Sequence, residues 1–176
     1  MCSSDLARQV PRVAHVPIGY VPELTRIVPA PEDIDVLFYG IFSQRRRAVL
    51  DALRARGLRV EWLLGLYGPA RDAVIARSKI VINMHLHEAQ VFEIVRVSYL
   101  LANRRTVVSE RGAHPTDESD LESGIAFAAY DELVDRCVEL LGDEHARREL
   151  AERGYQLFSA RSQSAILRDV LSSGLD

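Results

Sequence analysis

The chain alternates short apolar runs with longer segments in which apolar residues recur at helical spacing. Five apolar runs begin near residues 35, 59, 80, 106 and 125, and each has the length of a buried strand. The segments between them carry apolar residues three and four positions apart, as a helix with one buried face does. This alternation predicts an α/β fold, a Rossmann-like three-layer α/β/α domain with a mostly parallel sheet of about five strands.

Residues 80–110 hold the most informative part of this pattern. They form an apolar run, a polar loop, a helix-period segment and a second apolar run. A strand, loop, helix and strand in this order build a parallel sheet and gather polar side chains at the carboxyl end of the first strand. We therefore expect the chemistry here. Further helices are predicted over residues 44–56, 70–78, 130–141, 143–159 and 163–171.

A proline-rich stretch precedes the first strand. Residues 10–31 contain five prolines, which exclude a long helix and favour extended backbone, and Gly19 is expected to allow a turn that other residues resist. The first six residues, MCSSDL, resemble the in-frame translation of a sequencing adapter. We expect residues 1–6 to be a non-native leader, 7–34 a connector that lies against the folded body, and 35–176 a single domain.

Composition and charge narrow the function classes. The chain has 176 residues, is 48% hydrophobic and carries 22 Lys and Arg against 25 Asp and Glu, a net charge of −3 that gives no support for a nucleic-acid surface. Its two cysteines, Cys2 and Cys137, indicate neither a disulfide framework nor a zinc site, so a reducing, cytoplasmic setting is expected. G-x-S-x-G and G-x-G-x-x-G motifs are absent, which argues against an α/β hydrolase and a typical dinucleotide oxidoreductase.

An ordered set of segments resembles a known family. The segments are DVLFYG at 35–40, SKIVINMHLHE at 78–88, FEIVRVSYLLANRRTVVSE at 92–110 and LVDRCVELLGDEHARRELAERGYQLF at 133–158. Together they resemble the C-terminal, sugar-nucleotide-binding domain of GT-B glycosyltransferases. They are most similar to the group-one glycosyltransferase-like domain also found in spore-maturation-type proteins. The sequence VPIGY at 16–20 resembles the segment by which such enzymes cross between their two domains.

The resemblance implies a two-domain transferase. This half would bind a nucleotide-diphosphate sugar, a missing N-terminal domain would hold an acceptor of unknown identity, and the isolated fragment would be inactive. It implies no cofactor, no metal and no nucleic acid, with peripheral membrane association only through the missing part. It identifies no catalytic residue. A non-catalytic binding or interaction module with the same Rossmann-like fold is the alternative.

Several polar residues follow strands of the predicted sheet. Gly40 ends the first strand and permits close backbone approach, and Arg45 and Arg46 open the next helix, where a guanidinium could reach the diphosphate. A run of three arginines cannot point inward as a whole, so a solvated basic face is the alternative. Ser109 and Glu110 end a later strand, at the edge where ligands bind, although such residues also cap helices and loops.

Asn83, His85 and His87 occupy alternate positions after the third strand. In an extended segment they project to the same side. We prefer hydrogen bonds to sugar or phosphate over metal ligation as their role, and a plain polar loop is the other alternative. Two imidazoles at this spacing with Glu88 nearby could bind zinc, but no third clear ligand follows, and metal is the least favoured alternative.

Glu93 and Arg96 lie three residues apart at the start of the central helix and so share a face. Glu93 could accept from the two ribose hydroxyls, or the two side chains could pair with each other. Many retaining members of the resembled family carry two glutamates eight residues apart in this region. Gln90 and Ser98 occupy those positions here, which leaves Glu88 and Glu93 as the nearby carboxylates.

Overall fold

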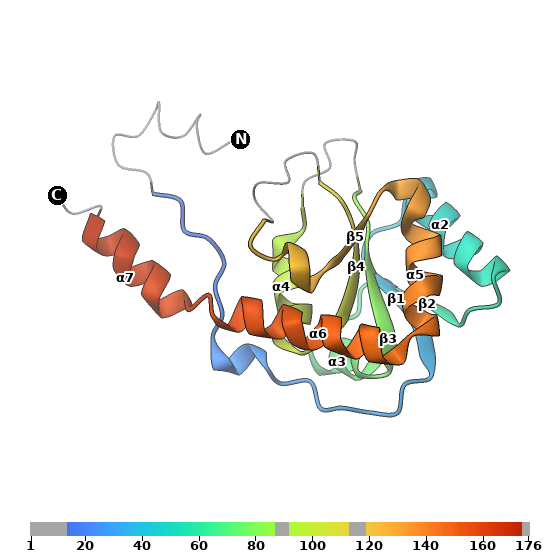
Figure 1. The fold of residues 1–176 in the computed structure, drawn as a ribbon, viewed down its shortest axis with the longest axis horizontal. Coiled ribbons are helices and arrows are strands. Elements are labelled where there is room, and N and C mark those ends of the chain that lie inside the picture. Colours follow the sequence, from blue (N-terminus) through green and yellow to red (C-terminus); the bar gives the residue numbers. More distant parts are fainter. Residues whose placement is uncertain (1–13, 87–91, 113–118, 174–176) are drawn as a thin grey trace.

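The computed structural model describes residues 14–86, 92–112 and 119–173 (Figure 1). Its centre is a five-stranded parallel sheet in the order β2-β1-β3-β4-β5, which confirms the predicted α/β fold. The strands are β1 Ile34–Tyr39, β2 Val60–Leu63, β3 Ser78–Asn83, β4 Thr106–Glu110 and β5 Ala126–Ala128.

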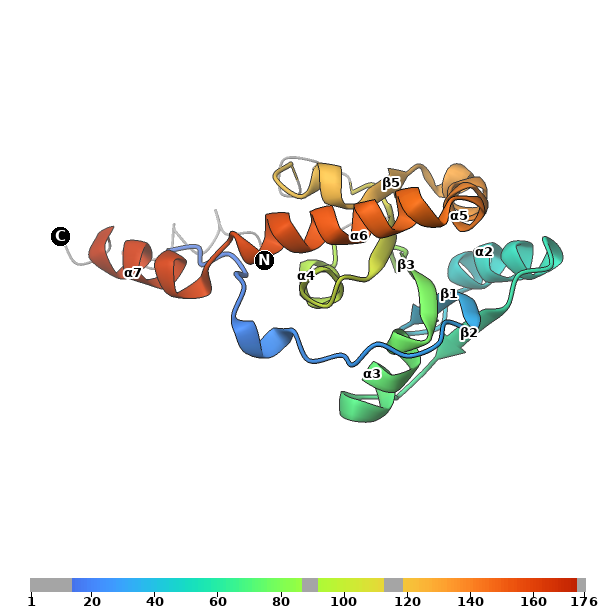
Figure 2. The ribbon, with the colours of Figure 1, turned by 60° about the horizontal axis from the view of Figure 1, so that its bottom comes forward.

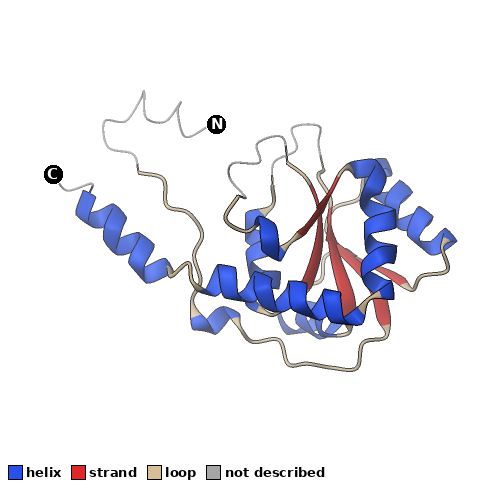
Figure 3. Ribbon diagram, in the orientation of Figure 1, coloured by secondary structure: helices blue, strands red, loops and turns tan. Residues whose placement is uncertain are grey.

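Helices cover both faces of this sheet, as Figures 1 and 2 show. Those of the layers are α2 Gln44–Ala55, α3 Gly68–Ala76, α4 Ile94–Ala102, α5 Leu133–Gly142 and α6 Glu144–Ser159. Helices α2 and α5 pack on one face, α3 and α4 pack on the other, and α6 contributes to both cores. The last helix, α7 Gln163–Ser173, projects away from the layers (Figure 3). Short 3₁₀ turns are η1 Pro22–Leu24, η3 Glu122–Gly124 and η4 Tyr130–Glu132.

The central strands form because they are apolar on both faces. Along β3, Ile80 and Ile82 point into the core under α2 and α5, whereas Val81 points into the core under α3 and α4. All three side chains are at most 1% exposed. Successive side chains of a strand point to opposite faces of the sheet, and helices cover both faces, so neighbouring residues of one apolar run pack into two different cores. This is why apolar runs in the sequence predicted strands.

The helix predicted over 70–78 begins earlier and ends earlier than expected. Gly68 has a φ of +59° and Pro69 occupies the first turn, where its missing N–H costs no hydrogen bond. Ser78 is the first residue of β3, and its hydroxyl donates to the Ile75 carbonyl at 2.8 Å. The helix predicted from residue 130 starts with the 3₁₀ turn η4 before α5 begins.

The segment before β1 lies against the end of α4. The Asn103 Oδ1 atom accepts the backbone N–H groups of Arg26 at 2.9 Å and Ile27 at 2.8 Å, and its Nδ2 donates to the Leu24 carbonyl at 2.8 Å. Gly19 is not among the glycines with positive φ, so backbone strain is not what favours glycine at this position. A Cβ at Gly19 would lie 2.8 Å from the Arg161 carbonyl oxygen, so glycine is needed for close backbone contact.

None of the helices in the described ranges is both long and apolar enough to cross a lipid bilayer.

Candidate functional site

The sheet order creates a switch point at the carboxyl ends of β1 and β3. From β1 the chain moves outward to β2 and then returns to add β3 on the other side of β1. Helix α2 follows β1 onto one face, and α4 follows β3 onto the other. In open α/β sheets, the loops diverge at such a point and leave a crevice in which ligands bind. A cluster of polar side chains lies at this edge of the sheet.

Arg46 is anchored at the carboxyl edge of the sheet by the backbone carbonyls that follow β1 and β3. Its side chain is 3% exposed. Its guanidinium donates to the Met84 carbonyl from Nε at 3.1 Å and from Nη2 at 2.6 Å, and to the Ile41 carbonyl at 3.1 Å. Nη2 also binds Glu93 Oε1 at 2.8 Å. Burial lowers the pKa of the Arg46 guanidinium, an effect that the charge of Glu93 opposes.

Glu93 joins Arg46 to a second arginine. Its Oε2 atom lies 2.6 Å from Arg96 Nη2, so one carboxylate serves two guanidiniums. Arg96 Nη1 donates to Asn83 Oδ1 at 3.0 Å, and Asn83 Nδ2 donates to Ser109 Oγ at 3.0 Å. The pairing of Glu93 with Arg96 is thus the arrangement found. A continuous polar network runs from α2 through α4 to the ends of β3 and β4.

Arg45 and Glu110 form a separate pair on the α2 side. Glu110 is 2% exposed and accepts from both terminal nitrogens of Arg45, with Nη1 to Oε2 at 2.6 Å. The same carboxylate accepts the His85 backbone N–H at 3.0 Å, and His85 Nε2 lies 3.3 Å from the Arg111 carbonyl. Arg45 also stacks 3.8 Å from the Tyr130 ring centroid. The hydrogen bond from Arg45 to Glu110 raises the pKa of Arg45 and fixes its charge.

Gly40 allows the arginines to approach the backbone. Its φ is +148°, and a Cβ there would lie 3.0 Å from Arg96 Nη2 and 3.2 Å from Phe38 Cζ. Its carbonyl accepts the Trp62 Nε1–H at 3.0 Å. In this structure the glycine therefore provides space for protein guanidiniums, where the sequence suggested close approach to a ligand.

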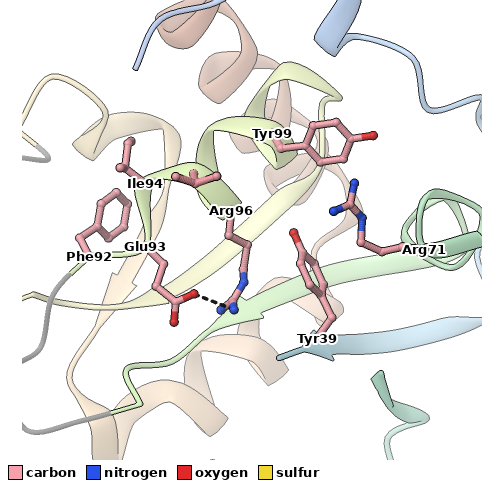
Figure 4. Close-up of a pocket in the computed structure, with 8 residues that line it drawn as sticks. Tyr39, Arg71, Phe92, Glu93, Ile94, Arg96 and Tyr99 are labelled. Carbon is pink, nitrogen blue, oxygen red and sulfur yellow. Dashed lines mark ion pairs between the residues drawn. The ribbon is translucent and has the colours of Figure 1, made fainter. Parts of the chain in front are cut away.

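A pocket of about 410 Å³ opens beside this network, on the α3 and α4 side. Figure 4 shows Tyr39, Arg71 and Tyr99 facing one another across it, with the Glu93–Arg96 ion pair on another wall. Its lining residues come from the end of β1, from α3 and from the start of α4: Tyr39, Arg71, Phe92, Glu93, Ile94, Val95, Arg96 and Tyr99.

Asp72 neutralises part of the pocket's charge. Arg71 donates to Asp72 Oδ1, at 3.0 Å from Nη2, and lies 4.7 Å from the Tyr99 ring centroid. Arg26, from the segment before β1, donates from Nε to Asp72 Oδ2 at 3.1 Å and to the Tyr99 hydroxyl at 3.0 Å. Burial raises the pKa of Tyr39 to about 12, so its hydroxyl remains protonated at neutral pH.

Guanidiniums outnumber carboxylates in these ion pairs. Among the described residues, Asp72 is shared by Arg26 and Arg71, and Glu93 is shared by Arg46 and Arg96. Four positive charges against two negative charges leave an excess of two around the pocket. Partly buried unmatched charge is costly, so the arrangement favours an anionic ligand.

The structure gathers most residues that the sequence singled out. Around the carboxyl edge of the sheet it places Gly40, Arg45, Arg46, Asn83, His85, Glu93, Arg96, Ser109 and Glu110. His87 lies outside the described residues, as do Glu88 and Gln90. Ser98 is buried in α4, and its hydroxyl donates to the Val95 carbonyl at 3.2 Å. The described part of the chain contains no group of three or more His, Cys, Asp or Glu that could hold a metal ion.

Six of the eight pocket residues were not singled out from the sequence: the apolar Phe92, Ile94 and Val95, and the polar or charged Tyr39, Arg71 and Tyr99. Tyr39 ends an apolar strand, and Arg71 resembles a solvated helix position. Tyr99 shares a helical face with Arg96, three residues earlier, which is a signal that could have found it.

Solved structures with the same fold are glycosyltransferases and related synthases. TarM covers 86% of this chain with a TM-score of 0.62 and 13% identity, and the chain covers 38% of TarM. AviGT4, a glycosyltransferase involved in avilamycin A biosynthesis, matches over 89% of this chain and 55% of its own, with a TM-score of 0.58 and 18% identity. A T4 phage BGT mutant in complex with UDP-glucose matches over 85% and 50%, with a TM-score of 0.59 and 14% identity. The fold is that of a GT-B-like domain.

Sequence comparison finds relatives without an assigned activity. Uncharacterized protein L140 of Acanthamoeba polyphaga mimivirus is 32% identical over 142 residues, which is 76% of this chain and 46% of that protein. Uncharacterized protein L138 of the same virus is 33% identical over 114 residues, 63% of this chain and 13% of that protein. The chain thus spans less than half the length of these relatives. No protein-family model matches it.

Proposed function

We propose that this domain binds a nucleotide-diphosphate sugar and acts as the donor-binding part of a glycosyltransferase. The observation that carries the proposal is the excess of two positive charges that the described residues place around the pocket near the carboxyl ends of β1 and β3. Transfer of a sugar from such a donor breaks its bond to a diphosphate, on which negative charge then develops. Pre-positioned guanidiniums stabilise that charge.

The GT-B-like fold supports this reading. One neighbour of this fold is a glycosyltransferase by name, and another is in complex with UDP-glucose. Because these structures are less than 20% identical to the chain, their likeness supports the fold alone. The proposed donor therefore rests on the charges and contacts of the site. The site supplies the anion-binding charge that a nucleotide diphosphate requires.

The division of labour follows from the same proposal. Residues 35–176 would be the C-terminal donor-binding domain of a group-one or spore-maturation-type transferase, 7–34 the connector and 1–6 a non-native leader. The acceptor would lie on a second, N-terminal domain, so the chain alone would bind donor without turning it over. A free, buried Cys137 fits a cytoplasmic setting.

The residues of the network take two kinds of role in this proposal. Arg96 and Glu93 line the pocket, where they would contact the ligand. Glu93 is the carboxylate in the pocket lining that could accept hydrogen bonds from the ribose hydroxyls. Asn83 and Ser109 orient Arg96 from behind. The pair of Arg45 with Glu110 fixes the loop around His85, and Arg46 holds the carbonyls of Met84, just after β3, and of Ile41, in the loop after β1.

A non-catalytic module with this fold is not favoured. An interaction module that binds no anion would gain no benefit from guanidiniums in excess of carboxylates at the carboxyl edge of its sheet, since partly buried charge without a counter-charge is costly. The charge excess is therefore better explained by an anionic ligand.

Isothermal titration calorimetry with UDP, GDP and dTDP tests the proposal. We expect at least one of the three to bind with one site per chain, and Arg96→Gln to weaken that binding at least tenfold, because a charge-assisted hydrogen bond contributes about 1.5–3 kcal/mol. Arg47→Gln, on the exposed face of α2, is the matched control and leaves affinity unchanged. Binding of none of the three to a folded sample would contradict the function.

A further inference from the structure

Besides the more exposed Arg26, four arginines lie near the candidate site, and they differ in how many protein groups already bind their guanidiniums. Arg46 directs its guanidinium at two carbonyls and Glu93, and its side chain is 3% exposed. Arg45 grips both oxygens of the buried Glu110 carboxylate. A bidentate guanidinium–carboxylate pair is a strong interaction that a ligand would have to break. Neither arginine is therefore well placed to hold a diphosphate.

Arg71 and Arg96 differ from Arg45 and Arg46 because both line the pocket. Their side chains are 20% and 13% exposed. Arg71 binds only one oxygen of Asp72, while Arg26 takes the other. Arg96 shares Glu93 with Arg46. Each of these two arginines thus shares its carboxylate with another arginine. Both guanidiniums can therefore bind an additional anion while they keep their present partner.

The Tyr39 hydroxyl adds a neutral donor between them. In Figure 4 it points into the space that Arg71 and Tyr99 border. Within the described residues it makes no hydrogen bond, and the guanidiniums of Arg96 and Arg71 lie 5.1 and 5.8 Å from its ring centroid. A phenol directed into a positively charged pocket is suited to donate to an anionic oxygen.

We propose that the donor's diphosphate binds in the pocket between α3 and α4, where Arg71, Arg96 and the Tyr39 hydroxyl donate to its oxygens, and that Arg45 and Arg46 hold the framework. This assignment rests on the proposed function and identifies its phosphate-binding residues. A nucleotide-diphosphate sugar carries one negative charge on each phosphate. Those two charges equal the excess of two positive charges around the pocket.

The rest of the pocket suits the uncharged parts of such a ligand. Phe92, Ile94 and Val95 form an apolar wall, and Val95 is 71% exposed. Apolar side chains of this kind pack against the flat face of a base or a sugar ring. The volume of about 410 Å³ is within the range of small-molecule sites, which is about 300–1,000 Å³.

The test compares single-site variants in calorimetric titrations. Arg71→Gln removes one guanidinium, Tyr39→Phe removes one oxygen atom, and Arg47→Gln is the exposed control. The ligands are the nucleoside diphosphate that binds the unmodified chain and inorganic pyrophosphate as its competitor. We expect Arg71→Gln to weaken the nucleotide by about tenfold to a hundredfold and Tyr39→Phe by about fivefold to tenfold, with Arg47→Gln unchanged. Pyrophosphate should compete with the nucleotide.

The outcomes separate this inference from the function on which it rests. Unchanged nucleotide affinity in both Arg71→Gln and Tyr39→Phe overturns the inference and leaves the proposed function standing. Absence of nucleotide binding to the unmodified chain overturns both. If circular dichroism shows that Arg71→Gln is unfolded, Tyr39→Phe decides alone, because it removes no charge, ion pair or hydrogen bond among the described residues. Failure of pyrophosphate to compete also overturns the inference.

Discussion

Replacing Glu93 with glutamine should destabilise the domain, because the substitution leaves two partly buried guanidiniums without their shared carboxylate. Glu93 binds Arg46 at 2.8 Å and Arg96 at 2.6 Å. The side chains of these arginines are 3% and 13% exposed, whereas that of Glu93 is 32% exposed. The amide keeps the size of the side chain but removes its charge, so the change isolates the electrostatic part of the interaction.

The burial of the Glu93, Arg46 and Arg96 side chains determines how much stability the Glu93→Gln substitution removes. Removing one partner of a fully buried ion pair costs about 3–5 kcal/mol, and an exposed pair contributes about 0–1 kcal/mol. Glu93 lies between these limits because solvent reaches it and barely reaches its partners. We expect Glu93→Gln to lower the free energy of unfolding by about 2 kcal/mol. In a domain of this size that corresponds to a fall of about 4–8 °C in melting temperature.

Urea denaturation followed by circular dichroism measures this loss, provided that the slope of unfolding free energy with urea stays the same. The control is Glu144→Gln, whose partner Arg148 is 75% exposed, and which should change stability by less than about 0.5 kcal/mol. A Glu93→Gln protein as stable as the Glu144→Gln control would refute the bridging role. Added pyrophosphate should restore part of the loss, because an anion in the pocket supplies the missing negative charge.

Three further predictions concern the framework. Hydrogen bonds from Arg59 hold the pKa of the Asp35 carboxyl far below its usual range. The stability that the ionised carboxylate contributes is therefore fully present above its unfolded pKa of about 3.9 and is lost as the pH falls from there toward its lower pKa in the folded state. Urea midpoints of Asp35→Asn should depend less on pH below pH 4 than those of the unmodified chain. Asn103→Ala should cost about 1–2 kcal/mol in urea unfolding and expose the segment before β1 to limited proteolysis, because two part-buried backbone donors lose their acceptor. Gly154→Ala should cost more than about 2 kcal/mol by the same unfolding assay, because its Cβ would lie 2.8 Å from the Gly124 carbonyl oxygen.

Each framework prediction has a result that would contradict it. Parallel pH profiles for Asp35→Asn and the unmodified chain would show that this carboxyl is not held charged by the fold. An Asn103→Ala protein with unchanged proteolysis and stability would show that the segment before β1 is held by other contacts. A Gly154→Ala loss below about 0.5 kcal/mol would mean that α6 can shift away from η3 at little cost.

The fold could be predicted from the sequence because the central strands are buried on both faces. The run of Ile80, Val81 and Ile82 in β3 is continuously apolar, which distinguishes a parallel strand covered by helices from a half-exposed strand. Helix ends were less certain. The boundary at Ser78 could not be read, because its hydroxyl bonds back to α3 while its backbone already belongs to β3.

The candidate site was readable only where its geometry is local. Glu93 and Arg96 lie one helical turn apart, and the ion pair that forms is one of the two arrangements that their spacing suggested. The bonds from Arg46 to Glu93 and from Arg45 to Glu110 span 47 and 65 residues, and they depend on the strand order, which spacing does not encode. The run of arginines divides for the same reason. Arg47 alone is largely exposed, at 64% of its side chain, so the basic-face alternative holds for that residue.

The most direct test of the central claim is a crystal structure of the chain with a bound nucleoside diphosphate. We predict that the two phosphates lie in the pocket between α3 and α4, within hydrogen-bonding distance of Arg71, Arg96 and the Tyr39 hydroxyl, with the ion pair between Arg45 and Glu110 intact. A nucleotide bound elsewhere on the domain, or phosphates seated on Arg45 with Glu110 displaced, would contradict the account.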